Sequence, residues 1–200
     1  HRSPGGGDNL FFFFFVAIGP DHGEYKWHCQ TTPGDNWDFT ATQPLVLADL
    51  DIEGRMRKVI MQAPKNGFFY VIDRTDGKFI SAKPFTYLNW AVNMTAEGRP
   101  VESDFARMKD SNVVIYPNFD GGHNWHPMAF NLKNKLMYIP ARIASFPYGY
   151  NSNWKFDQPA EFGSGTGWNL GSDINFNHDF RADPNAPKGG DQGFLLAWDP

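Results

Sequence analysis

Apolar residues along this chain form short runs bounded by turn residues rather than a helical stripe. No window shows sustained i, i+3, i+4, i+7 apolar spacing with helix caps. The 20 Gly and 15 Pro are spread over the whole chain and further disfavour long helices. Strands are predicted over residues 10–18, 25–29, 44–49, 57–62, 68–72, 113–116, 128–130, 136–139 and 194–198. This pattern predicts an all-β fold: a sandwich, a barrel or a propeller.

A repeated pattern favours the propeller among these three. VAIGPDHGEY at residues 16–25 aligns with YVIDRTDGKF at residues 70–79, 54 residues later. Each copy predicts a strand, a turn closing on Gly and a second strand that opens with an aromatic residue. LLAWDP at residues 195–200 begins a third copy. A period near ~50 residues is typical of four-stranded propeller blades.

Three stretches depart from this regular pattern. Residues 90–112 and 148–193 are rich in Gly, Asn, Asp and Pro and exceed an ordinary hairpin connection, so both are predicted to be loops on one propeller face. Residues 11–15 are all Phe, which places bulk on both faces of a strand. A buried inner strand is the favoured interpretation of this run, and a sequence error is its main rival.

The bulk composition indicates a globular protein with small-molecule partners. Hydrophobic residues make up 41% of the chain and charged residues 20%, and the formal net charge of −4 comes without any long Lys/Arg run. This charge pattern argues against nucleic-acid binding. The longest apolar stretch, residues 10–18, is about half the ~20 residues that a membrane helix needs. The single Cys29 is expected to be a structural thiol.

Three separate turns carry side chains suited to chemistry. Asp38 lies between two large aromatic residues, and it is either a turn residue that bonds nearby N–H groups or a general base or cation ligand. Lys65 precedes an Asn-Gly pair typical of a tight hairpin, where a solvated Lys is the simpler interpretation. Asn124 and Trp125 follow in a third turn, where they either face a pocket or cap the core. The functional alternatives together predict a pocket assembled from several loops.

Two further motifs carry weaker predictions. His123 and His126 are three residues apart, but they lack a helix, a third ligand and a neighbouring carboxylate, so a zinc site is not favoured. Residues 163–168, GSGTGW, are Gly-rich but lead into no helix. They predict a tight loop that packs on Trp168 rather than a nucleotide site.

Four ordered motifs resemble the pyrroloquinoline quinone (PQQ)-dependent alcohol dehydrogenases, and most closely those of the quinohaemoprotein type. They are TPGDNWD at 32–38, APKNGFFYVIDR at 63–74, NWHPM at 124–128 and GSGTGWN at 163–169. The resemblance runs in order from about Gly7 to Pro200. It implies an eight-bladed β-propeller, of which residues 1–200 would be an internal fragment, incomplete at both ends. The start at His1 without Met or a signal pattern, and the stop inside a strand-to-turn pattern, fit that expectation.

The resemblance also implies roles for individual residues. Asp38 matches the active-site aspartate that lies beside a quinone-bound Ca²⁺ and takes the proton of the alcohol, so it is expected to be both base and metal ligand. Lys65 matches the position that reaches the ortho-quinone oxygens, and Asn124 and Trp125 match residues beside the cofactor. A neutral Thr40 stands where lanthanide-dependent relatives carry an additional Asp, which favours Ca²⁺.

The implied function is the PQQ- and Ca²⁺-dependent oxidation of primary alcohols to aldehydes in the periplasm. Cytochrome c or another electron acceptor is the expected partner, a haem c would lie in a domain not included here, and the remainder of the propeller is expected to be needed for folding. Two alternatives stay open. One is a PQQ-dependent dehydrogenase of a sugar, polyol or aldehyde, and the other is a propeller that binds a ligand without turnover.

Overall fold

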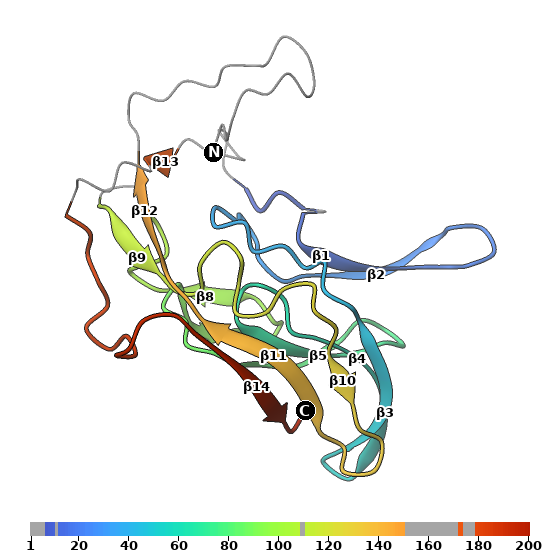
Figure 1. The fold of residues 1–200 in the computed structure, drawn as a ribbon. Coiled ribbons are helices and arrows are strands. Elements are labelled where there is room, and N and C mark those ends of the chain that lie inside the picture. Colours follow the sequence, from blue (N-terminus) through green and yellow to red (C-terminus); the bar gives the residue numbers. More distant parts are fainter. Residues whose placement is uncertain (1–6, 11, 109–110, 151–171, 174–178) are drawn as a thin grey trace, which may run out of the picture.

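The regular elements of this chain are β-strands (Figure 1). The computed structural model describes residues 7–10, 12–108, 111–150, 172–173 and 179–200. In chain order the strands are β1 Phe14–Ile18, β2 Tyr25–Gln30, β3 Val46–Ile52, β4 Arg55–Gln62, β5 Phe68–Asp73, β6 Phe79–Pro84, β7 Ala91–Met94, β8 Pro100–Glu102, β9 Val113–Ile115, β10 Ala129–Phe130, β11 Met137–Ile143, β12 Phe146–Tyr150, β13 Ser172–Asp173 and β14 Gln192–Trp198. Within the described residues no helix has the length and apolar character needed to span a membrane.

One complete four-stranded antiparallel sheet forms the centre of the structure, in the order β3-β4-β5-β6. Its first hairpin turns through Glu53 and Gly54, which both have positive φ, of 53° and 74°. Two such residues are the requirement of the type I′ turn, whose twist matches that of paired strands. Each strand therefore follows its neighbour directly, as in a propeller blade.

Two partial sheets cover the two faces of this central sheet. Along β5, Phe68, Tyr70 and Ile72 pack into one buried cluster that includes residues of β1 and β2. Phe69 and Val71 point the other way, into a second cluster that includes residues of β11 and β14. All six residues of β5 are buried, because alternate side chains meet a different sheet on each face.

The predicted repeat is visible as the same turn in successive sheets. In the β1–β2 turn, Gly23 N–H donates to the Gly19 carbonyl at 2.9 Å, and in the β5–β6 turn, Gly77 N–H donates to the Asp73 carbonyl at 2.8 Å. The β10–β11 turn, which lies outside the aligned copies, forms the same kind of bond, from Lys135 N–H to the carbonyl of Asn131 at 2.8 Å. Lys135 and Gly77, the donors in two of these turns, both have a left-handed backbone, with a φ of 60° at Lys135 and 77° at Gly77.

The third copy, at residues 195–200, occupies the place expected of it. It lies in β14, which pairs with β11 in the order β10-β11-β14, as β5 pairs with β4 in the order β3-β4-β5. The three sheets thus hold corresponding strands of successive repeats, which confirms the choice of a repetitive β-architecture over a simple sandwich.

Two predictions about irregular regions were wrong in part. Residues 90–112 are not only loop, because β7 and β8 form an antiparallel hairpin there. The second region, 148–193, includes the end of β12, all of β13 and the first residues of β14. Strands β8, β12 and β13 are only two to five residues long, and the others contain few consecutive apolar residues. Their turn-rich composition therefore gave no strand signal.

The Phe run also differs from its prediction as a buried inner strand. Among the described residues of the run, only Phe15 is buried, with its ring centroid 6.3 Å from that of Tyr70, whereas Phe12 is 56% exposed. Phe13 has a left-handed φ of 54°, so the strand starts at Phe14. Residue 11 lies outside the described residues. The prediction for Cys29 fits the structure, since burial raises the pKa of its thiol to about 11, which makes it a poor nucleophile.

Candidate active site

Asp38 lies in the connection between β2 and β3, in a turn organised by another carboxylate. The Asp35 side chain is 2% exposed and accepts the backbone N–H groups of Trp37 at 3.3 Å, Asp38 at 3.1 Å and Phe39 at 3.0 Å. Asp38 has a φ of 67°. For a residue with a Cβ this left-handed conformation costs roughly 1–2 kcal/mol, so the surrounding contacts must hold it.

The two aromatic neighbours of Asp38 anchor the turn in the core. Trp37 and Phe39 stack with ring centroids 5.5 Å apart, and both contact the ring of Trp90. The Trp37 indole donates to the Ala106 carbonyl at 2.9 Å, and the Arg107 guanidinium lies 4.8 Å from its ring centroid. With both flanking side chains buried, the Asp38 side chain is the one left 48% exposed.

Lys65 comes to Asp38 from the turn before β5. Its ammonium nitrogen lies 3.2 Å from Asp38 Oδ2 and 3.2 Å from the Asp38 carbonyl oxygen, while its side chain is only 11% exposed. The interpretation of Lys65 as a solvated hairpin residue was therefore wrong. The structure brings these two predicted site residues into contact, although they are 27 residues apart in sequence.

The Lys65 turn is fixed by Asn66, a residue that sequence reasoning treated only as part of an Asn-Gly turn. Asn66 is fully buried, its amide nitrogen donates to the Thr31 carbonyl at 3.1 Å and to the Tyr70 hydroxyl at 2.9 Å, and its Oδ1 accepts Phe68 N–H at 3.1 Å. The Trp90 indole donates to the Asn66 carbonyl at 2.8 Å. Asn66 thereby ties the Lys65 turn to the segment that leads into the Asp38 turn.

The loop before β10 packs directly on Lys65. A Cβ on Gly121 would lie 2.4 Å from Lys65 Cα, and Gly122 N–H donates to the Lys65 carbonyl at 3.0 Å. His123, which is 1% exposed, has Nδ1 2.6 Å from the Ala63 carbonyl and Nε2 2.6 Å from the His126 carbonyl. Both ring nitrogens of His123 are used in packing this loop.

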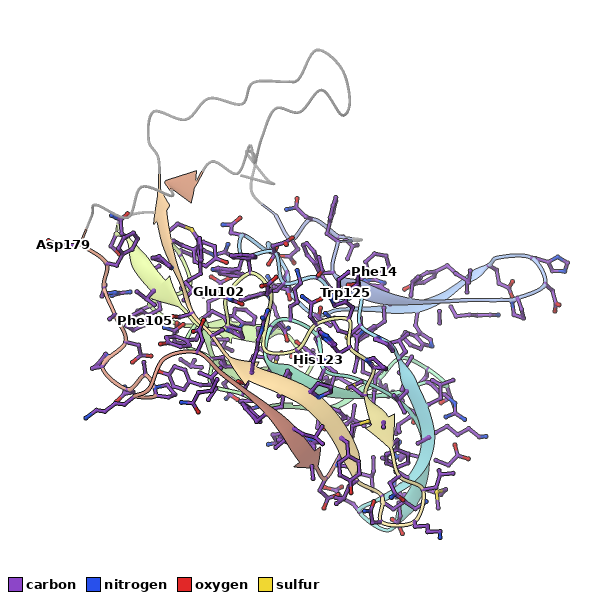
Figure 2. The ribbon with its side chains drawn as sticks, viewed as in Figure 1. Phe14, Glu102, Phe105, His123, Trp125 and Asp179 are labelled. Atoms are coloured by element: carbon purple, nitrogen blue, oxygen red, sulfur yellow. The ribbon has the colours of Figure 1, made fainter. Side chains whose placement is uncertain are left out.

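Trp125 lies on the same loop as His123, as Figure 2 shows, and Asn124 lies between them in sequence. The Asn124 amide nitrogen donates to the Asp120 carbonyl at 2.9 Å, and its oxygen accepts Trp125 N–H at 2.9 Å. Trp125 is 77% exposed, so the alternative that it caps the core was wrong. The structure thus places Asn124 and Trp125 on the loop that covers Lys65, without a recorded hydrogen bond to Asp38 or Lys65 among the described residues. The Gly-rich motif at 163–168 lies outside those residues.

Tyr148, in β12, closes the Asp38 turn from another side. Its hydroxyl donates to the Trp37 carbonyl at 3.1 Å. Burial raises the pKa of this phenol, and the negative charges of Asp35 and Asp38 raise it further. Tyr148 is therefore a neutral hydrogen-bond donor at ordinary pH. Thr40 follows the turn, with its N–H donating to the Asp38 carbonyl at 2.9 Å.

The chain is similar to known proteins over its whole length. The PQQ family model, described as the glucose/ethanol/alcohol dehydrogenase β-propeller domain, matches residues 1–82. The quinohemoprotein alcohol dehydrogenase of Comamonas testosteroni is 50% identical, with 100% of this chain and 27% of that protein covered. The 1-butanol dehydrogenase (cytochrome c) of Thauera butanivorans is 45% identical, with 100% of this chain and 28% of that protein covered.

Solved structures agree with these sequence relatives. The crystal structure of the Comamonas testosteroni enzyme superposes with a TM-score of 0.84 at 48% identity, covering 100% of this chain and 29% of that one. In sequence and in fold, the chain resembles the PQQ-dependent alcohol dehydrogenases. A europium-containing methanol dehydrogenase also matches, with a TM-score of 0.71 at 36% identity, covering 74% of this chain and 26% of that one.

This similarity identifies the three layered sheets as blades of a PQQ β-propeller. The chain spans little more than a quarter of the length of these relatives. The donor set of the site fits the family's cofactors in part. A buried ammonium suits the oxygens of an ortho-quinone, and a half-exposed carboxylate suits a hard cation. Ca²⁺ takes about six to eight oxygen ligands, and the described residues contain no group of three or more His, Cys, Asp or Glu placed to hold a metal.

Proposed function

We propose that this chain carries the catalytic base and one cofactor-binding side of a quinoprotein alcohol dehydrogenase that oxidises primary alcohols to aldehydes. The observation that carries the proposal is the contact between Asp38 and Lys65, at 3.2 Å, where two separate turns meet. A carboxylate open to solvent on one side and held by a nearly buried cation on the other is suited to accept a substrate proton. The similarity to alcohol dehydrogenases over the full chain supports the same reaction.

Asp38 accepts the proton of the alcohol hydroxyl. Its side chain is 48% exposed, so a small alcohol reaches it, and the ion pair with Lys65 holds it in place. Base catalysis of this kind contributes roughly 10²–10⁴-fold to the rate. The oxidation also removes a hydride, that is, one hydrogen with two electrons, from the alcohol carbon. PQQ, when bound, would accept this hydride.

Lys65 has a second role as a fixed positive charge. Its ammonium group donates to Asp38, and the remaining N–H is available to an oxygen of the quinone. A preorganised cation stabilises negative charge that develops on such an oxygen. Because the side chain is only 11% exposed, water screens this interaction little. Asp38 would also be the one Ca²⁺ ligand from the described residues, and Thr40, being neutral, adds no further carboxylate for a trivalent ion.

Asn124 and Trp125 contribute to the cofactor side of the site from the loop that packs on Lys65. The Asn124 amide keeps one N–H and one oxygen lone pair beyond its two bonds within the loop, and these suit the polar edge of a quinone. The exposed indole of Trp125 offers an apolar surface of the size of a ring system.

The whole protein extends this proposal beyond the described residues. Residues 1–200 would be an internal part of a single eight-bladed propeller, with the remaining Ca²⁺ and PQQ ligands on other blades. A haem c would lie in another domain, cytochrome c or a similar acceptor would be the partner, and the location would be periplasmic.

Blades bury their faces on their neighbours, so residues 1–200 expressed alone are expected to melt without a cooperative transition. A sharp calorimetric transition of the monomeric fragment would contradict this folding prediction. The periplasmic location is tested separately, by osmotic-shock fractionation of the native host.

The test of the reaction is dye-linked ethanol oxidation by the full-length protein that contains this chain. The apoprotein is assayed with PQQ and Ca²⁺ together, with each alone, and with neither. Turnover that requires both supports the proposal. Bound PQQ without ethanol oxidation, but with turnover of a sugar, polyol or aldehyde, would replace the substrate class. Absence of PQQ binding would favour a ligand-binding propeller without turnover.

A further inference from the structure

We propose that Asp35 is a positioning residue for the reaction, acting through the backbone of Asp38. This inference rests on the proposed function, in which Asp38 is the base. Asp35 is 2% exposed, and its two carboxylate oxygens accept the N–H groups of three residues in succession, at distances of 3.0 to 3.3 Å. The middle one of these three is the N–H of Asp38 itself.

The conformation of Asp38 explains why such a carboxylate is needed. With a φ of 67°, Asp38 adopts a backbone that its Cβ disfavours, and this backbone directs its side chain toward the Lys65 ammonium. Hydrogen bonds from consecutive N–H groups to one carboxylate are charge-assisted and are stronger than those to a neutral oxygen. Asp35 therefore stabilises the arrangement of this turn that presents Asp38 to Lys65.

The Thr40 N–H and the Lys65 ammonium bond to the Asp38 carbonyl, and further contacts hold the neighbours of Asp38. The Trp37 indole bonds to the Ala106 carbonyl, the Tyr148 hydroxyl bonds to the Trp37 carbonyl, and Phe39 is fully buried. These contacts keep the turn in the core, and the Tyr148 bond also holds the carbonyl side of the peptide between Trp37 and Asp38. The Asp38 N–H, which lies in that peptide, is bonded to Asp35.

An amide at position 35 removes this function with little change of shape. In Asp35→Asn, one oxygen is replaced by an NH₂ group, which donates and therefore repels the backbone N–H that it faces. We expect kcat for ethanol to fall about 10- to 100-fold, because small displacements of a reacting group cost up to about 10²-fold. The KM for ethanol and the amount of PQQ bound should stay within about threefold of the parent, since Lys65 and the cofactor-side loop are unchanged.

Asp73 provides a matched control. It is also a buried carboxylate that caps a turn, accepting Thr75 N–H at 2.9 Å, but it lies at the other end of β5 from the Lys65 turn. Asp35→Asn and Asp73→Asn are compared in the full-length protein reconstituted with PQQ and Ca²⁺, with rates expressed per bound PQQ. We expect both variants to lower the melting temperature and only Asp35→Asn to lower kcat. Its kinetic isotope effect with C1-deuterated ethanol should equal or exceed that of the parent, because the chemical step is the one slowed.

The outcomes separate this inference from the function on which it rests. If the parent enzyme fails to oxidise any alcohol, the proposed function is wrong. If the parent is active and Asp38→Asn is inactive, but Asp35→Asn keeps the parent kcat per bound PQQ, Asp35 is only a structural cap and the inference is overturned. Should Asp35→Asn fail to fold, Asp35→Ser, which keeps one acceptor oxygen, carries the same criteria with a smaller expected loss of kcat.

Discussion

The two ends of strand β5 each carry a Lys–Asp ion pair, and the two pairs differ in their surroundings. At the start of the strand, Lys65 lies 3.2 Å from Asp38, with an 11% exposed lysine side chain and partners from two distant turns. After its end, Lys78 lies 3.0 Å from Asp76 within a single turn, with a 78% exposed lysine. The second pair belongs to a hairpin turn that recurs in other sheets, whereas the first is made once and requires a left-handed Asp.

This difference shows how one strand serves both the fold and the site. Exposed ion pairs within a turn contribute little to stability, so Lys78 and Asp76 are replaceable. The Lys65–Asp38 pair combines a strained backbone with a lysine withdrawn from water. Both features lower the free energy of unfolding. Such costs concentrate where a structure holds reactive groups.

Replacement of the acids should give the largest contrast between the two ends. In the full-length reconstituted enzyme, Asp38→Asn should lower kcat for ethanol by about 10²–10⁴-fold, because it removes the proton acceptor and leaves the shape of the side chain. Asp76→Asn should leave kcat unchanged. Steady-state dye-linked assays per bound PQQ measure both, and equal activities of the two variants would contradict the role of Asp38.

Replacement of the lysines comes next. Lys65→Met keeps most of the side-chain volume and removes the charge, so kcat should fall by roughly 10²–10³-fold, the loss typical of a group that stabilises developing charge. Lys78→Met should retain full activity. A Lys65→Met variant with the parent kcat and only a raised KM would show that Lys65 binds substrate and transition state equally.

Two glycines extend the comparison from charge to packing. A Cβ at Gly121 would lie 2.4 Å from Lys65 Cα, and one at Gly77 would lie 2.6 Å from the Trp27 ring. Each Gly→Ala change should cost about 1–3 kcal/mol of stability through overpacking and a positive φ. Only Gly121→Ala should also lower kcat per bound PQQ, because it displaces Lys65. Thermal melts and assays of both variants measure this, and a fully active Gly121→Ala would mean that the loop moves instead of Lys65.

The smallest expected effect concerns the repeated turn itself. Lys135 holds with a φ of 60° the place that Gly77 holds in the β5–β6 turn. The left-handed conformation costs a residue with a Cβ roughly 1–2 kcal/mol, and glycine costs about 0.5–1 kcal/mol in entropy, so Lys135→Gly should stabilise the protein by roughly 0.5–1 kcal/mol. Lys133→Gly, at a position without positive φ, should be neutral or destabilising. Chemical denaturation compares the two, and the opposite order would contradict the equivalence of the turns.

Sequence reasoning found most of the strands because their information is local. Apolar runs between turn residues located β3, β4, β5, β11 and β14, and the repeat around Gly23 and Gly77 located the hairpins. Strands as short as β8 and β13, at three and two residues, carry no such signal and depend on tertiary pairing.

The candidate site was predictable to the level of single residues but not of their contacts. Asp38 and Lys65 were named from their motifs, yet the bond between them joins two turns and has no local sequence signature. The supporting residues were missed for the same reason. Asp35, Asn66 and His123 act through buried hydrogen bonds to backbone groups, and polar residues in turns are most often solvated. An Asp three residues before a candidate base, within a turn, was the one local signal for Asp35.

The most direct measurement is the rate at which ethanol reduces enzyme-bound PQQ in a single turnover, followed by stopped-flow absorbance in the full-length protein and in its Asp38→Asn variant. Both proteins are first loaded with PQQ and Ca²⁺ to equal occupancy. If Asp38 is the base, the parent reduces its cofactor rapidly and the variant does so about 10²–10⁴-fold more slowly. Equal rates of reduction at equal occupancy would show that Asp38 takes no proton in the reaction.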